Sequence, residues 1–187
     1  MSTNERILSP FTLPNGTELK NRLLMAPMTT CTGYYDGTVT SELVEYYRAR
    51  SGSIGTIIVE CCFVDDLGLA FPGAIGIDND EKIAGLAKIA EAIKSKGSKA
   101  LLQIYHGGRM VDPKLIGGRT PVGPSAVAAP RDGAATPVAL TAEEVEGMIG
   151  KFGEAVRRAI QAGFDGVEIH GANTYLIQQF YSPNSNQ

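Results

Sequence analysis

Four short apolar runs recur along the sequence, and stretches with a different periodicity separate them. Residues 22–28, 56–64, 99–106 and 166–170 have the length and composition of buried strands. Residues 40–51, 78–97 and 141–163 place apolar side chains at helical spacing. Strands that alternate with helices pair in parallel through right-handed crossovers. We therefore predict an α/β protein, either a doubly wound sheet or part of a closed β/α barrel.

The loop after the first run favours the barrel. A doubly wound dinucleotide-binding fold would carry a Gly-x-Gly-x-x-Gly turn there, and the sequence has neither this turn nor a Walker-type loop.

Polar residues predict where the helices begin. Thr40 or Ser41 can cap the first helix, and capping-box spacing is present at Asp78 with Glu81 and at Thr141 with a glutamate three residues later.

Residues 11–20 form a separate small unit ahead of the first strand. Two strand-like runs flank Asn15 and Gly16. That dipeptide suits the positive φ angles of a type I′ turn. We predict a β-hairpin that precedes the main fold.

Composition narrows the class of protein. The chain has 187 residues, 43% of them hydrophobic, which is enough for a sizeable core. A net charge of −3 with interspersed charges argues against nucleic-acid binding. No apolar run has membrane-spanning length, and the three cysteines lack metal-site or disulfide spacing. We expect a soluble, cytoplasmic protein with no metal site, nucleic-acid partner or membrane contact.

Polar side chains cluster where the predicted strands end. In β/α barrels the carboxyl ends of the strands form the active face, so these residues should converge on one opening. For any single residue the alternative is that it satisfies a buried backbone group. The residues are Thr29, Thr30, Cys61, Gln103, His106 and His170.

Two carboxylates and two thiols fall inside predicted strands. Glu60 and Glu168 would be costly there unless paired, and we expect each to meet an arginine inside the barrel. Cys61 and Cys62 should point to opposite faces and pack as small apolar side chains.

The chain resembles the old yellow enzyme family of FMN-dependent ene-reductases and NAD(P)H:flavin oxidoreductases. The resemblance covers nearly the whole sequence and rests on several motifs in a fixed order. It implies the amino-terminal half of a TIM (β/α)8 barrel, with strands 1 to 4 of 8 in residues 1–187 and the carboxyl-terminal half absent. The motifs are LKNRLLMAPMT at 19–29, QIYHGGR at 103–109, PVGPSA at 121–126, HGANTYLIQQF at 170–180 and SPN at 182–184.

The resemblance assigns a group of residues to the cofactor, FMN. The backbone of Ala26, Pro27 and Met28 would line the flavin. Thr29 would hydrogen-bond near O4 of the ring, and Gln103 would bond its pyrimidine edge. Cys61 and His170 would lie beside the ring.

The resemblance also implies a substrate site and a reaction. His170 and Asn173 would hold the oxygen of a small electrophile such as an activated alkene, and Tyr175 would donate the proton. NAD(P)H would reduce the flavin beforehand. Thr174 stands where the family commonly has glycine, so a requirement for positive φ would strain this loop. His106 and Arg109 match a family segment, and we interpret them as loop structure.

Two other functions stay open on the sequence. In such barrels the phosphate is held by loops after strands seven and eight, so weak FMN binding is expected and the chain could be a non-catalytic truncated fragment that binds no flavin. A non-flavin barrel such as an aldolase or isomerase is disfavoured because no strand-end lysine or phosphate loop is present. With strand edges unpaired, we expect self-association or pairing with the missing half-barrel.

Overall fold

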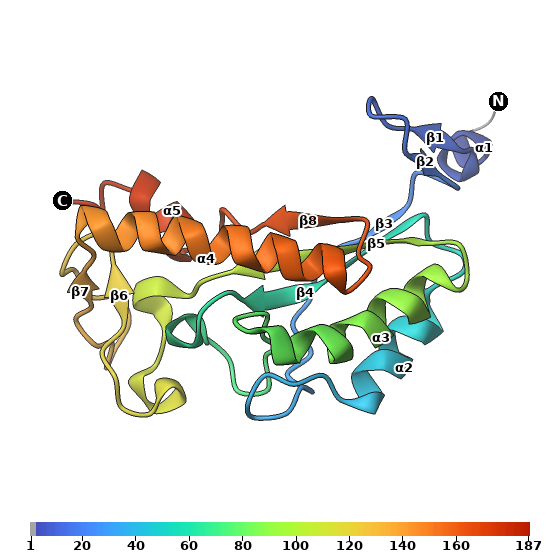
Figure 1. The fold of residues 1–187 in the computed structure, drawn as a ribbon. Coiled ribbons are helices and arrows are strands. Elements are labelled where there is room, and N and C mark those ends of the chain that lie inside the picture. Colours follow the sequence, from blue (N-terminus) through green and yellow to red (C-terminus); the bar gives the residue numbers. More distant parts are fainter. Residues whose placement is uncertain (1–2) are drawn as a thin grey trace.

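A parallel four-stranded sheet forms the centre of the computed structural model, which describes residues 3–187 (Figure 1). Its spatial order, β3-β4-β5-β8, is also the order of the strands along the chain, and every neighbouring pair is parallel. This confirms the predicted α/β alternation. The strands are β3 (Leu24–Met25), β4 (Thr56–Phe63), β5 (Lys99–Tyr105) and β8 (Gly166–Ile169).

Three helices connect these strands and cover one face of the sheet. Figure 1 shows α4 in front of the strands and α2 and α3 below them, and residues of all three helices pack in one core with β4 and β5. They are α2 (Ser41–Arg50), α3 (Ile83–Lys94) and α4 (Ala142–Gln161). A sheet of consecutive parallel strands with all its crossover helices on one side is the arrangement of a β/α barrel, whereas a doubly wound sheet has helices on both faces.

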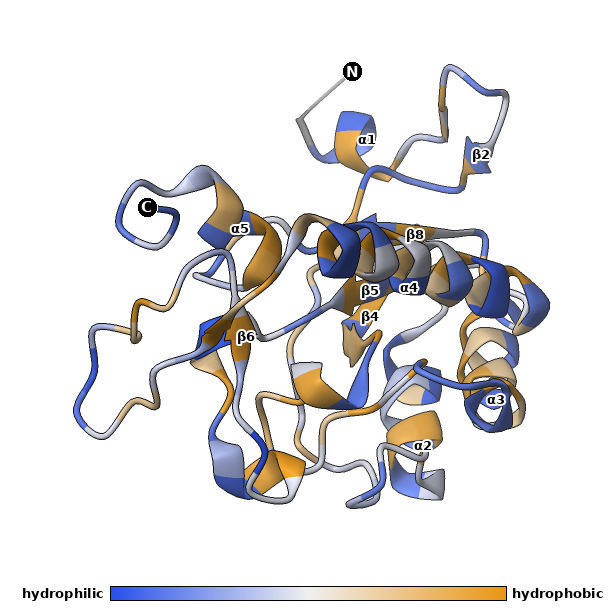
Figure 2. Cartoon of the chain, turned by 60° about the vertical axis from the view of Figure 1, so that its left-hand side comes forward, coloured by the Kyte–Doolittle hydropathy of each residue, from blue (hydrophilic) through white to orange (hydrophobic). Residues whose placement is uncertain are grey.

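The main core lies between the sheet and these helices. Alternate residues of β4 and β5, such as Ile57, Val59 and Leu102, point toward the helices and are fully buried there. Figure 2 shows the corresponding concentration of hydrophobic residues along β4 and β5. The pairing of β4 with β5 shifts register between Val59 and Cys62. Cys62 packs in the main core and Cys61 in a second cluster, so the predicted opposite orientations are confirmed.

Helix caps agree with the sequence in two of three cases. Thr40 caps α2 by accepting a hydrogen bond from the N–H of Leu43. Thr141 and Glu144 form the predicted capping box at α4. The predicted cap at Asp78 is wrong, because the chain enters α3 through a 3-10 turn, η2 (Asp80–Lys82), and Asn79 caps this turn instead.

The predicted hairpin is present, but its turn is of a different type. β1 (Phe11–Thr12) pairs antiparallel with β2 (Glu18–Leu19). Gly16 has φ 85, whereas Asn15 does not have the positive φ that a type I′ turn requires. Pro14 favours position i+1 of a type I turn, which Gly16 then follows in the left-handed region. The hairpin and α1 (Thr3–Leu8) lie at the end of the sheet where the strands begin (Figure 1).

The opposite end of the sheet carries the long connection between β5 and α4. It contains η3 (Gly108–Met110), η4 (Pro113–Ile116) and a two-stranded parallel sheet of β6 (Val122–Gly123) and β7 (Val138–Ala139). The last helix, α5 (Leu176–Tyr181), lies at this same end (Figure 1). The carboxyl ends of the strands are therefore surrounded by the longest loops of the chain.

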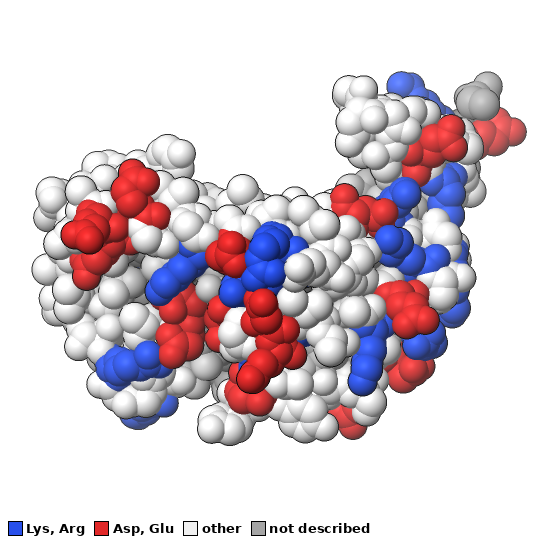
Figure 3. All heavy atoms as spheres, viewed as in Figure 1, with Lys and Arg blue, Asp and Glu red and all other residues white. Residues whose placement is uncertain are grey.

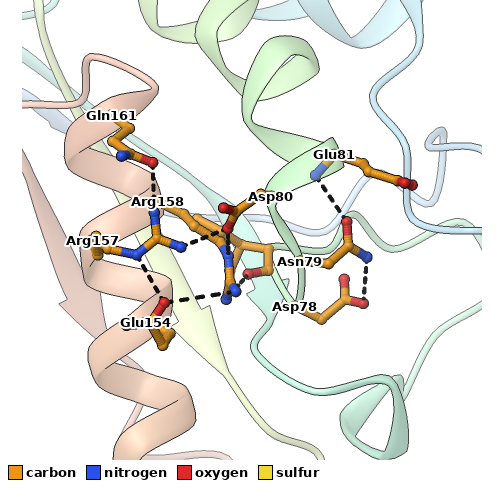
Figure 4. Close-up of polar contacts among 9 residues, drawn as sticks. Asp78, Asn79, Asp80, Glu81, Glu154, Arg157, Arg158 and Gln161 are labelled. Carbon is orange, nitrogen blue, oxygen red and sulfur yellow. Dashed lines mark hydrogen bonds and ion pairs between the residues drawn. The ribbon is translucent and has the colours of Figure 1, made fainter.

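An exposed ion network joins the start of α3 to α4 (Figure 4). Asp80 Oδ1 accepts hydrogen bonds from Arg157 at 2.6 Å and from Arg158 at 2.7 Å. Arg157 also pairs with Glu154 at 2.8 Å, and Arg158 donates to the carbonyl of Ile77.

Figure 3 shows acidic and basic side chains interspersed over this face of the molecule. Within residues 3–187 no helix is long and apolar enough to cross a membrane.

Candidate active site

The structure brings the predicted site residues to the carboxyl ends of the four parallel strands. Parallel pairing aligns these ends, so residues far apart in the sequence become neighbours. Residues 26–29 follow β3, Cys61 lies near the end of β4, and Gln103 lies in β5. His170 directly follows β8, and residues 171–175 connect it to α5.

Thr29 and Cys61 contact each other across β3 and β4. Thr29 Oγ1 lies 3.2 Å from Cys61 Sγ. Burial raises the pKa of the Cys61 thiol to about 11, and the hydrogen bond with Thr29 only partly offsets this. The thiol is therefore protonated at neutral pH, in agreement with the prediction that Cys61 packs rather than reacts. Ala26 and Met28 are exposed beside this pair.

Gln103 is oriented by its neighbour on β8. The register pairs Gln103 with Glu168, and Gln103 Nε2 donates to Glu168 Oε1 at 2.7 Å. With its nitrogen engaged, the amide presents its oxygen as an acceptor that has no protein partner within residues 3–187. Glu168 thus pairs with an amide in the described chain, and the expected arginine partner was wrong there.

Glu60 is also held by neutral partners rather than by an arginine. Its Oε2 accepts from the hydroxyl of Tyr47 at 3.1 Å, and Thr30 donates to Oε1 at 3.3 Å. Burial raises the pKa of Glu60, and these hydrogen bonds lower it. The prediction of an arginine partner was wrong because Tyr47 on α2 reaches through the core to the strand, a contact between elements that no local pattern reveals.

His170 is a neutral hydrogen-bond donor in this arrangement. Burial lowers the pKa of its imidazole, although the nearby Glu168 carboxylate acts in the opposite direction. Nδ1 accepts from the N–H of Ala172 at 3.3 Å, which assigns the ring proton to Nε2. The side chain therefore offers one N–H donor, at Nε2, to a ligand at the strand ends.

Tyr175 packs among aromatic rings at the same place. Its ring meets His170 edge-to-face with centroids 4.8 Å apart, and Tyr105 lies 5.2 Å away. Burial raises the pKa of Tyr175 to about 12, with a smaller contribution from Cys61. The phenol stays protonated at neutral pH, and its hydroxyl has no hydrogen-bond partner among the described residues.

The loop that carries Tyr175 has an unusual backbone. Asn173 has φ 51 and Thr174 has φ 63, both in the left-handed region. For a β-branched residue such as Thr174 this conformation costs roughly 1–3 kcal/mol and persists only where surrounding contacts hold it. The strain anticipated for Thr174 is therefore present. Asn173 is exposed, and its side chain contacts neither His170 nor Tyr175 through any hydrogen bond found in residues 3–187.

Tyr105 and Phe71 also belong to this site, and neither was predicted from the sequence to do so. Tyr105 is fully buried, and its hydroxyl accepts from the N–H of Ala70 at 3.2 Å. Phe71 meets Tyr175 edge-to-face at 6.3 Å. Tyr105 lies two residues after Gln103 on the same strand face, so strand periodicity was a usable signal for it. Phe71 comes from a loop, for which no such signal exists.

The donor set fits the ring system of a flavin. An isoalloxazine has a flat apolar body with one polar edge, and the strand ends offer exposed Ala26 and Met28 together with the Gln103 amide and the Thr29 hydroxyl. A metal centre has less support. Among the described residues, no three His, Cys, Asp or Glu side chains gather in a way that could hold a metal ion.

A parallel β/α unit with its polar groups at the strand ends is the architecture of barrel enzymes. The model of the NADH:flavin oxidoreductase / NADH oxidase family matches residues 6–187. The chain therefore belongs to this family, which includes the old yellow enzymes.

Two longer relatives resemble the chain along its whole length. The NADH:fumarate oxidoreductase of Klebsiella pneumoniae (strain 342) is 88% identical over 187 residues, covering 100% of this chain and 20% of the relative. The NADH:acrylate oxidoreductase of Vibrio harveyi is 59% identical over 182 residues, covering 97% of the chain and 18% of the relative. The chain thus spans about a fifth of the length of these relatives.

The fold matches solved structures of the family. The old yellow enzyme from Trypanosoma cruzi superposes with a TM-score of 0.90 at 33% identity, covering 99% of this chain and 56% of that chain. The prediction that the sequence corresponds to the amino-terminal half of such a barrel is confirmed by this match.

Proposed function

We propose that this chain supplies the flavin-ring and substrate half of an FMN-dependent NAD(P)H oxidoreductase that reduces activated alkenes or related electrophiles. The observation that supports it most is the pairing of His170 with Tyr175, 4.8 Å apart, at the strand ends that also hold Gln103 and Thr29. Because the chain belongs to the flavin oxidoreductase family, we interpret this pair as the group that binds the substrate oxygen and the group that donates the proton.

In this proposal the flavin lies across the carboxyl ends of β3, β4, β5 and β8. The backbone of Ala26, Pro27 and Met28 would line the ring, Thr29 and Gln103 would bond its polar edge, and Cys61 and His170 would lie beside it. When bound and reduced, the flavin supplies the hydride. The phosphate of FMN would be held by loops of the barrel's second half.

The substrate site needs one oxygen-binding group and one acid. His170 donates from Nε2 to the carbonyl, carboxyl or nitro oxygen, and Asn173 assists from the loop. Tyr175 releases its hydroxyl proton to the substrate carbon that does not receive hydride. The names of the relatives suggest fumarate and acrylate as first test substrates, because both are electron-poor alkenes.

The proposal is tested in two stages, cofactor uptake and then each half-reaction. Equilibrium dialysis with FMN measures binding, and Gln103→Met should weaken it about tenfold through the loss of a hydrogen bond to the ring. Gln178→Met is the matched control, since the side chain of Gln178 makes no hydrogen bond in residues 3–187. Anaerobic mixing with NADH or NADPH should then bleach the flavin, and acrylate or fumarate should restore its colour.

Each outcome separates the proposal from its alternative. A chain that takes up no FMN at millimolar concentration, alone or with the second half of the barrel, is the non-catalytic fragment. Flavin that NADH bleaches but neither alkene restores would limit this site to NADH oxidation and remove the roles proposed for His170 and Tyr175.

A further inference from the structure

The side chain of Gln179, on α5, joins the two loops that border the candidate active site. It is fully buried, with 0% of its surface exposed. Its Nε2 donates to the carbonyl of Gly107 at 3.2 Å and to the carbonyl of Thr174 at 2.6 Å, and its Oε1 accepts from the N–H of Arg109 at 3.1 Å. One amide therefore holds the loop after β5 against the loop after β8.

The loop after β5 is shaped around this amide. Gly108 has φ 58, and a Cβ at this position would collide with the Gln179 amide. The collision means that backbone and amide are in direct contact there, with no space for water between them. The turn after β5 therefore packs directly against the Gln179 side chain.

The loop after β8 depends on the same amide in another way. Thr174 is in the left-handed region at φ 63, and its carbonyl, which Gln179 bonds, immediately precedes Tyr175. The N–H of Leu176, on the other side of Tyr175, donates to the carbonyl of His106 at 2.9 Å. The backbone hydrogen bonds on either side of Tyr175 therefore tie it to the loop after β5. Leu176 bonds His106 directly, and Thr174 bonds the Gln179 amide, which holds that loop.

We propose that Gln179 is a positioning residue: it holds the strained Thr174 backbone so that the Tyr175 ring stays packed against His170. This inference rests on the proposed function for the roles of Tyr175 and His170. An amide suits the position because it combines two N–H donors with one acceptor, matching two carbonyls and one N–H. Methionine is an uncharged, apolar side chain of the same length, so Gln179→Met keeps the shape and removes all three hydrogen bonds of the amide.

The first test measures the loop without any activity. Hydrogen exchange on the 187-residue chain compares Gln179→Met with Gln178→Met, a control one residue away on the same helix. We expect exchange at the amides of Arg109, Tyr175 and Leu176 to accelerate at least about tenfold in Gln179→Met and to stay unchanged in the control. Unchanged protection of Tyr175 and Leu176 in Gln179→Met overturns the proposal.

The second test uses the flavin-loaded protein and separates positioning from general stability. Gln179→Met should lower kcat roughly ten- to a hundredfold with KM changed less than about threefold, because the proton donor is misplaced while the oxygen site persists. Adding Thr174→Gly should recover most of kcat, since glycine adopts positive φ without needing the amide to hold it. A loss of kcat that Thr174→Gly does not recover contradicts the proposal, as does an equal loss in Gln178→Met.

The two tests also tell apart failure of this inference and failure of the proposed function. If Gln179→Met does not fold, the double variant with Thr174→Gly and the single Gln179→Glu, which keeps the acceptor for Arg109, take its place in both measurements. A wild-type protein without turnover rejects the proposed function, and the exchange result then decides alone whether Gln179 holds this loop.

Discussion

At the scale of single residues, Tyr47 and Glu60 show how a buried carboxylate is accommodated without a counter-charge. Tyr47 Oη donates to the Glu60 carboxylate at 3.1 Å and accepts from the Glu60 N–H at 2.9 Å. Both side chains have no exposed surface. One hydroxyl thus satisfies a buried carboxyl group and a backbone donor at the same time.

Removing this hydroxyl should destabilise the fold. In Tyr47→Phe the carboxylate and the N–H of Glu60 each lose a partner inside the core, so we expect the free energy of unfolding to fall by about 1–3 kcal/mol. Urea denaturation measures it. Tyr46→Phe is the control, because the Tyr46 hydroxyl makes no hydrogen bond in the described chain. A loss of equal size in both variants would show that the hydroxyl of Tyr47 contributes nothing specific.

The proposed proton donor makes a prediction about pH. Burial raises the pKa of Tyr175 to about 12, so its proton is available below that pH and is lost as pH rises through it. Alkene reduction should therefore show no loss from this group between pH 6 and about 10. Tyr175→Phe should slow alkene reduction roughly a hundredfold or more and leave flavin reduction by NADH unchanged.

Stopped-flow measurement of the two half-reactions provides the check. Tyr181→Phe serves as the matched control, since Tyr181 is an exposed tyrosine at the end of α5, the helix that directly follows Tyr175. Equal rates of alkene reduction in wild type and Tyr175→Phe would remove the assigned role.

At the scale of elements, an ion network joins the start of α3 to α4. Arg158 is largely buried, and it bonds both the Asp80 carboxylate and the carbonyl of Ile77. The hydrogen bonds from Arg158, and next those from Arg157, lower the pKa of Asp80. A carboxylate whose pKa is lowered in the folded state stabilises it above the unfolded pKa, and this contribution disappears as pH falls through the folded value.

Asp80→Asn should therefore lower stability at neutral pH and matter less in acid. We expect a small decrease of the urea midpoint at pH 7, because the pairs are exposed and screened, and convergence with wild type once the pH falls below the lowered pKa of Asp80. Asp132→Asn is the control, as Asp132 is exposed and forms no ion pair within residues 3–187. A midpoint difference that persists unchanged into acid would exclude the ionised carboxylate as its cause.

At the scale of the whole molecule, the sheet formed by the described residues has two unpaired edges, and an apolar groove lies beside one of them. β3 and β8 are the outer strands of the parallel sheet. Beside β8 a groove of about 350 Å³ lies between α4 and α5, lined by Val145, Met148, Ile149, Phe152, Ile169, Leu176, Ile177, Phe180 and Tyr181. An open edge next to exposed apolar side chains favours association.

We predict that the 187-residue chain self-associates through this region. Sedimentation velocity over a range of concentrations should show dimers or larger species, and the pair Ile149→Lys with Ile169→Lys should shift the population toward monomer. Ile160→Lys is the control, because Ile160 is 65% exposed on α4, close to the 60% of Ile149, but lies outside the groove. A monomer at every concentration would show that the open edge and groove are tolerated in water.

The sequence by itself determined the four central strands, the three long helices and their order, because these depend on local periodicity and on caps. Apolar runs fixed the four parallel strands, and Thr40 and Thr141 marked where two helices begin. Motif order pointed to the family that the comparison then showed. These signals lie within short stretches of chain, so they can be read without knowing which elements meet.

Only the tertiary structure decided which groups are partners across elements. Three examples are Glu60 with Tyr47, Gln103 with Glu168, and Gln179 with the two loops. These partners are 13, 65 and up to 72 positions apart in the sequence. Each side chain has several possible partners of suitable chemistry, and packing selects among them. The site is therefore predictable as a set of residues at the strand ends, whereas its hydrogen bonds and protonation states follow from the assembled fold.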